Sequence, residues 1–211
     1  MQSTKKVARG RPMLNPEEGL KRVIQATEAI LVKQELDTHS MAAIAREASM
    51  SKRTLYSLVK SKEALIELVI KHIRTYATDL LDGPVEGPEQ AVAILEEFLY
   101  RWANAALSPI AINIVRMAMD ERRTLPSIAK THFESGSEFF VRRLSAWLTQ
   151  QAEQGYLMVQ APLFVSELIW AGLIGRHMFF VALGYKKAPS RGKLKHNIQV
   201  ILPMCNIKMP L

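Results

Sequence analysis

This chain of 211 amino acids has very little cysteine and no apolar run close to its first residues. Its single cysteine, Cys205, excludes an internal disulfide framework and is typical of a protein in a reducing cytoplasm. The basic start, MQSTKKVARGRP, is not followed by the apolar core of a signal peptide, so we expect none. The single cysteine and the missing apolar core of a signal peptide both favour a protein that acts inside the cell.

Groups that carry enzyme chemistry are also missing. No histidine stands in an HExxH or Glu-x-x-His spacing, which gives a helical metal site little support. Cys205 has no histidine in a recognisable spacing, and no glycine-rich loop could cradle a phosphate. We therefore expect no catalysis, no metal and no other cofactor. The histidines are His39, His72, His132, His177 and His196.

One apolar stretch, residues 163–184, has about the length that spans a bilayer. It contains Glu167, Arg176 and His177, and a charge near the membrane centre costs roughly 2.5–3.5 kcal/mol on insertion scales. We expect a helix that is buried or packed against a second copy of the chain, and no contact with a membrane.

Acidic residues are fewer than basic ones, and the imbalance lies mainly near the N-terminus. The formal charge is +8, from 28 Lys and Arg against 20 Asp and Glu. Residues 1–74 hold 14 of these basic residues but only 8 of the acidic ones. An anionic partner would fit this distribution, although a solvated basic surface has the same composition.

Helical periodicity extends over almost the whole chain, which predicts an all-α fold. The segment DGPVEGP, residues 82–88, is the clearest break. We expect a flexible basic arm over 1–15, a three-helix helix-turn-helix module within 16–80 and a helical bundle over 84–204. Within the bundle we expect one helix over 126–154, bent at Gly136, and another over 162–184.

The most informative segment is residues 40–65, SMAAIAREASMSKRTLYSLVKSKEAL. Its apolar spacing predicts two short helices joined by a tight turn and followed at once by a third. Ser40, Ser51 and Ser61 each stand where a helix should begin, because a serine hydroxyl can accept a bond from a first-turn amide. The outward face of the second helix is basic and rich in hydroxyls, which suits the major groove of DNA.

The string IAREASMSKRTLYSLVKSKEAL resembles the DNA-binding motif of the TetR family of bacterial transcriptional regulators, and the resemblance covers about residues 17–70. Residues 84–184 resemble, more loosely, the C-terminal domain of AefR-like members, on the spacing of Arg116, Glu121 and Pro126. The chain departs from the family at Ser49, where a glycine is common in the turn between the two short helices.

The resemblance implies that the second short helix enters the major groove. Lys52 and Arg53 are then expected to contact base edges, and Thr54 and Tyr56 to contact phosphate. Lys62 would add charge at the start of the next helix, and the basic arm would enter the minor groove or remain free. The complete set of expected DNA contacts is Arg9, Arg11, Ser40, Ser51, Lys52, Arg53, Thr54, Tyr56 and Lys62.

The resemblance also implies a two-fold dimer, formed by apolar faces that could instead be buried within one chain. The expected interface residues are Phe140, Leu144, Trp147, Trp170 and Ile174.

Family members usually hold a small effector in the bundle, and methionine and aromatic residues suit an adaptable pocket, although they can equally be plain core. Arg116 could pair with a carboxylate such as Asp120 or anchor an anionic effector. The expected lining is Phe98, Trp102, Arg116, Met117, Met119, Phe133, His177 and Phe179.

Together these features predict a cytoplasmic, nucleoid-associated homodimer. It would bind a palindromic double-stranded DNA operator as a repressor and would be released by a small-molecule effector. The alternative is an architectural DNA-binding protein without an effector. A single footprint at a palindrome would indicate the repressor, whereas uniform coating of DNA would indicate the architectural protein.

Overall fold

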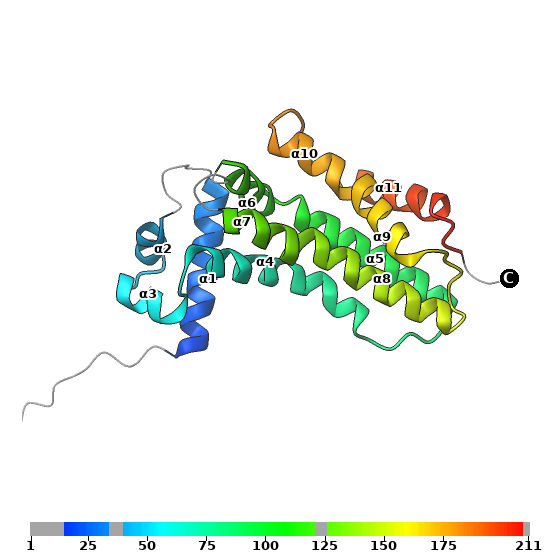
Figure 1. Cartoon of the computed structure of the whole chain (residues 1–211), viewed down its shortest axis with the longest axis horizontal. Coiled ribbons are helices and arrows are strands. Elements are labelled where there is room, and N and C mark those ends of the chain that lie inside the picture. Colours follow the sequence, from blue (N-terminus) through cyan, green and yellow to red (C-terminus); the bar gives the residue numbers. More distant parts are fainter. Residues whose placement is uncertain (1–14, 34–39, 121–125, 209–211) are drawn as a thin grey trace, which may run out of the picture.

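The computed structural model describes residues 15–33, 40–120 and 126–208. The described residues form helices and one isolated bridge, with no β-strand, as an all-α fold requires (Figure 1). The α-helices are α1 (Pro16–Lys33), α2 (Met41–Glu47), α3 (Lys52–Leu58), α4 (Lys62–Thr78), α5 (Pro88–Ala106), α6 (Pro109–Asp120), α7 (Pro126–His132), α8 (Glu138–Glu153), α9 (Pro162–Trp170), α10 (Arg176–Ala182) and α11 (Arg191–Met204).

Helices α1 to α3 and the start of α4 share one small core at the left of Figure 1. Val23, Ile44, Leu55 and Leu65 meet there and are almost completely buried. Burial of the predicted apolar faces therefore holds α2 and α3 against α1, because helices of seven residues are too short to be stable alone.

The three expected serine caps are confirmed. The hydroxyl oxygens of Ser40, Ser51 and Ser61 accept bonds from amides three residues on, at 3.2, 3.0 and 3.1 Å. Each cap satisfies a first-turn amide that has no partner within its own helix.

The turn between α2 and α3 has a left-handed backbone at Ser49, with φ of 54°. The amide of Ser49 donates to the carbonyl of Arg46, and that of Met50 donates to the carbonyl of Ala45, which is the Schellman pattern at a helix end. Arg22 of α1 donates to the carbonyl of Ala48 at 2.7 Å. This bond fixes the turn on α1.

The larger core lies among α5, α8, α9 and α11. Phe98 and Phe140 stack at its centre with ring centroids 5.7 Å apart, and Trp147 is 1% exposed. A third cluster joins the two ends of the molecule, where Ile66 and Val69 of α4 pack with Ile114 of α6 and Ile128 of α7. Helix α4 thus contributes to both ends.

Two π-helical turns divide helices that the sequence predicts as continuous. The turn Phe133–Ser137 (η3) separates α7 from α8 at the expected bend, and Ala171–Gly175 (η4) separates α9 from α10. At Gly175 an added Cβ would lie 2.7 Å from Cζ3 of Trp170, so only glycine fits beside the indole ring.

Replacing Ser49 with glycine should raise the free energy of unfolding by about 0.5–1 kcal/mol, because glycine adopts positive φ without a Cβ clash. Ser49 is exposed, so little contact is lost. Urea denaturation measures the change. The control Ala146→Gly, at an exposed position inside α8, should lower stability by about 0.5–1 kcal/mol, and a loss at both sites would contradict the role of the turn.

Candidate nucleic-acid interface and ligand cavity

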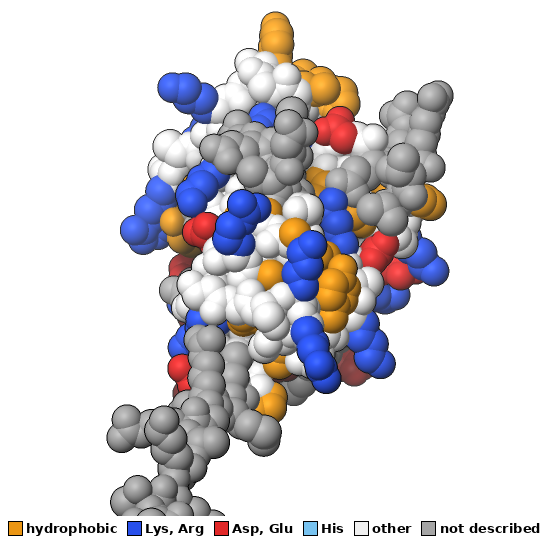
Figure 2. Space-filling model, turned by 90° about the vertical axis from the view of Figure 1, so that its left-hand side faces the viewer, with side chains coloured by type: hydrophobic (Ala, Val, Ile, Leu, Met, Phe, Trp, Pro, Cys, Tyr) orange, Lys and Arg blue, Asp and Glu red, His pale blue; other side chains and the backbone are white. Residues whose placement is uncertain are grey.

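Helix α3 presents an exposed basic face at the end of the molecule that is seen directly in Figure 2, where Lys and Arg side chains predominate. Lys52 and Arg53 are exposed, and neither forms an ion pair with a described residue. Tyr56 is 50% exposed although it is aromatic. The opposite face of α3 is held by Leu55, which is fully buried.

The remaining predicted contacts of this surface lie near the ends of short helices. Ser40 and Ser51 are exposed, and the Ser51 hydroxyl also lies 2.8 Å from that of Thr54. Lys62 is the first residue of α4 and is half-buried. Arg9 and Arg11 lie outside the described residues.

Glu63, beside Lys62, connects α4 to α7. The hydroxyl of Ser127 donates to Oε1 of Glu63 at 2.9 Å. Bonds from the Glu63 backbone amide, Ser61 and Ser127 lower the pKa of this carboxyl group. The carboxylate is therefore favoured at the positive end of α4, where a negative charge is stabilising.

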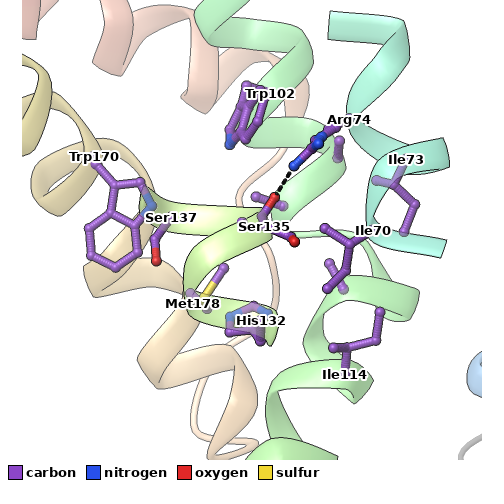
Figure 3. A pocket seen from close by; sticks show the side chains of 14 residues that line it. Ile70, Ile73, Arg74, Trp102, Ile114, His132, Ser135, Ser137, Trp170 and Met178 are labelled. Carbon is purple, nitrogen blue, oxygen red and sulfur yellow. Dashed lines mark hydrogen bonds between the residues drawn. The ribbon is translucent and has the colours of Figure 1, made fainter. Parts of the chain in front are cut away.

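An apolar cavity lies between α4, α5, α6 and the π-helical turn η3, with one residue each from the end of α7, α9 and α10 (Figure 3). Its empty volume is about 560 Å³, part of which is open to solvent. The large apolar side chains of its wall include Ile70, Ile114, Trp102, Trp170 and Met178. The polar side chains of the lining are Arg74, His132, Ser135 and Ser137.

Of the eight residues expected in a pocket, only Trp102 lines this cavity. Phe98 and Met117 are buried in the large core and in the cluster around α6, where they pack against neighbouring side chains. Met119, Phe133 and Phe179 are 43, 56 and 52% exposed, so they lie on the outer surface. The structure thus places these side chains outside this cavity, because methionine and aromatic composition does not reveal which way a side chain points.

His177 also lies outside the cavity. Its Nε2 lies 3.4 Å from the side-chain nitrogen of Asn197 on α11. Burial, together with the charges of Arg176, Lys186 and Lys193, lowers its pKa.

Arg116 forms no ion pair with a carboxylate of the described residues. Its guanidinium donates to the carbonyls of Ala182 and Val181 at 2.8 and 3.0 Å, and to Oδ1 of Asn113 at 3.0 Å. The side-chain nitrogen of Asn113 donates in turn to the carbonyl of Leu31. Arg116 therefore caps the carboxyl end of α10 and belongs to a chain of polar contacts that extends to α1.

The expected interface residues of α8 are part of the core of their own chain. Phe140, Leu144 and Trp147 are at most 1% exposed, and Ile174 of η4 is fully buried. Trp170 is half-buried and faces the cavity. Intrachain packing already covers Phe140, Leu144, Trp147 and Ile174. The large exposed apolar residues of this region are Leu163, Phe164, Leu168, Phe179, Leu183, Val200 and Met204.

The segment Pro162–Ala182 is the one helix among the described residues that is long and apolar enough to cross a membrane. Length and composition alone are weak grounds for a span, because a helix packed within a globular protein can meet the same criteria. Here α9 packs extensively on α8, and η4 contacts α11.

Most residues of the cavity lining are absent from the residues predicted for a pocket, among them Ile70, Arg74 and His132. Ile70 and Arg74 lie four positions apart on α4, a spacing that places both side chains on one face of the helix. His132 occupies the end of α7 just before the π-helical turn. Burial lowers the pKa of both Arg74 and His132. No pattern in a single sequence reports such burial.

Comparison with known families gives two matches. A model described as the C-terminal domain of AefR-like transcriptional repressors matches residues 93–204, which is more than half of the chain. A model described as bacterial regulatory proteins of the tetR family matches residues 23–69, including α2 and α3. No curated protein matches the chain.

Solved structures with the same fold include a protein of Mesorhizobium loti MAFF303099 assigned to the TetR family. It is 17% identical, with a TM-score of 0.70 over 90% of this chain and 98% of that one. The flavonoid-responsive regulator FrrA is 24% identical, with a TM-score of 0.63 over 91 and 98%. GusR of Salmonella enterica is 18% identical, with a TM-score of 0.65 over 92 and 98%.

His132 should make stability depend on pH. Because burial lowers its pKa in the folded state, the unfolded chain takes up a proton first as the pH falls. The free energy of unfolding should therefore decrease between about pH 7 and pH 5. His132→Gln should reduce this slope in urea denaturation, whereas His196→Gln, at an exposed site, should leave it unchanged. Equal slopes in His132→Gln and the wild type would contradict the prediction.

Proposed function

We infer the function from one premise: the chain belongs to the TetR family of bacterial transcriptional regulators, with an AefR-like C-terminal domain. It is a DNA-binding transcriptional regulator. We propose that it is a repressor, acts in the cytoplasm and leaves a palindromic operator when a small molecule binds. One observation carries this proposal: α4 begins directly after the exposed helix α3 and supplies Ile70 and Arg74 to the cavity.

In the proposed complex, α3 lies in the major groove. Lys52 and Arg53 would pair with base edges, since both side chains can donate to guanine O6 and N7. Tyr56, Thr54 and Lys62 would contact phosphates and set the position of the helix. Ser40 and Ser51 would support the same contacts at the starts of α2 and α3. The arm with Arg9 and Arg11 would add minor-groove contacts.

Two copies would read the two halves of the operator, with their α3 helices about 34–36 Å or a multiple of that apart. We propose that the copies meet through the outer faces of α9, α10 and α11, where the exposed apolar residues gather. Several large apolar side chains are exposed on these helices, and exposed apolar surface commonly marks a protein interface.

The effector would occupy the cavity and favour one of two arrangements of the dimer. Such a ligand shifts the balance only by binding one arrangement more tightly than the other. Because α4 belongs both to the cavity wall and to the core under α3, a change at Ile70 or Arg74 is coupled mechanically to α3. FrrA is described as flavonoid-responsive, so we consider a small organic molecule a suitable effector class.

Selection of bound fragments from random DNA by the full-length chain tests this function. A repressor should enrich one palindrome, and a footprint should cover that site alone. Coating of DNA without sequence preference would instead identify an architectural DNA-binding protein and overturn the proposal.

Arg53→Ala should weaken binding to the selected operator about 5- to 150-fold and relax the preference for one base pair, as expected when a bidentate contact worth about 1–3 kcal/mol is lost. Fluorescence anisotropy at fixed salt measures the affinity. Lys187→Ala removes an equal charge from an exposed site on the loop between α10 and α11 and should bind normally. Equal losses in both variants would show that only net charge matters.

Phe164→Glu and Leu168→Glu should each convert the dimer to monomers and abolish tight operator binding, because a carboxylate would be desolvated in an apolar interface. Light scattering coupled to size exclusion gives the mass. Phe133→Glu alters an equally exposed phenylalanine on a different element and should remain dimeric. Dimers in all three variants would place the interface elsewhere.

A further inference from the structure

The cavity contains a positive charge that has no acidic partner in the part of the chain that the structure describes. Arg74 is half-buried and forms no ion pair with a carboxylate of the described residues. Glu67, the acidic residue that influences it, lies 2.7 Å from Lys71 instead. A buried charge is costly unless it is paired. The structure therefore provides a cation at the cavity wall whose charge no described carboxylate balances.

Two contacts fix the position of this guanidinium. One nitrogen donates to the backbone carbonyl of Ser135 in the π-helical turn (Figure 3), and the carbon Cζ lies 3.6 Å from the ring centroid of Phe139. Phe139 in turn stacks on Trp102, with centroids 6.0 Å apart. A guanidinium carries five N–H donors, and a single bond to a carbonyl leaves most of them available.

The rest of the lining restricts the ligand further. Among the described residues, Arg74 is the only Lys or Arg of the lining, and burial lowers the pKa of His132, which favours its neutral form. One cation matches one negative charge better than the two of a phosphate monoester. The isoleucines, Trp170 and Met178 require an apolar body for that ligand.

We propose that the cavity binds an apolar monocarboxylate, with a ring or a short chain as its body and its carboxylate paired with Arg74. The planar fork of arginine matches a carboxylate in a bidentate geometry that lysine cannot reproduce. This inference rests on the proposed function, because it names the chemical class of the effector. A carboxylate paired with Arg74 would also contact α4 directly, at the residue through which α4 is bonded to η3.

The experiment measures binding of cinnamate, hydrocinnamate and octanoate, each beside its uncharged primary amide, to the full-length protein by calorimetry at neutral pH. At least one acid should bind about tenfold or more tightly than its amide, since a hydrogen bond to a charged group contributes more than a neutral one. Arg74→Gln should abolish that difference, and Arg74→Lys should keep part of it. Arg142→Gln removes an exposed arginine of α8 and should change nothing.

Equal binding of acids and amides, or no binding of any probe, would overturn the carboxylate assignment. A preference for the acid that survives in Arg74→Gln would overturn the role of Arg74. Melting curves of each variant establish that it is folded, and Arg74→Lys provides a second test if Arg74→Gln is unstable. If an acid binds through Arg74 without changing operator affinity, the ligand class stands and effector-controlled release fails.

Discussion

The requirement that α4 bury two faces at once is the constraint on which the rest of the structure depends. Leu65 faces the core shared with α1 and α3, whereas Ile66 and Val69 face α6 and α7. An apolar side chain that leaves one of these clusters exposes surface worth about 1.5–3 kcal/mol. The DNA-binding end and the cavity are therefore not joined by a flexible linker, and displacement of α4 affects both cores.

Polar contacts reinforce the same junction from another side. Asn113 and Arg116 of α6 bond to the carbonyl of Leu31 on α1 and to the last carbonyls of α10. Buried polar groups of this kind are costly when unpaired, so they favour one arrangement of the helices over others of similar apolar content. Helix α10 of the proposed dimer surface and helix α1 beneath the DNA-binding motif are thus held by two residues of α6 that lie three positions apart.

The sequence predicted local features better than spatial ones. Periodicity and the caps at Ser40, Ser51 and Ser61 were sufficient for the helix-turn-helix motif, since these depend on residues three or four apart. The direction of a side chain across a bundle depends instead on residues far apart in the chain. Phe98 and Phe140 accordingly proved to be a stacked pair in the core, and Arg74 emerged as a cavity residue only when α4 met η3. Arg9 and Arg11 remain predictions.

The two π-helical turns have a consequence for how this protein can change over evolutionary time. Each turn holds one residue more than an α-helical turn, and one residue corresponds to about 100° of rotation around a helix. Deleting a single residue from Phe133–Ser137 or Ala171–Gly175 would therefore restore a regular helix and turn everything beyond it to a different side. Substitutions can adjust the shape of the cavity gradually, whereas a one-codon deletion in either turn would rearrange its wall in a single step. Chain length in these two segments should consequently vary less than residue identity.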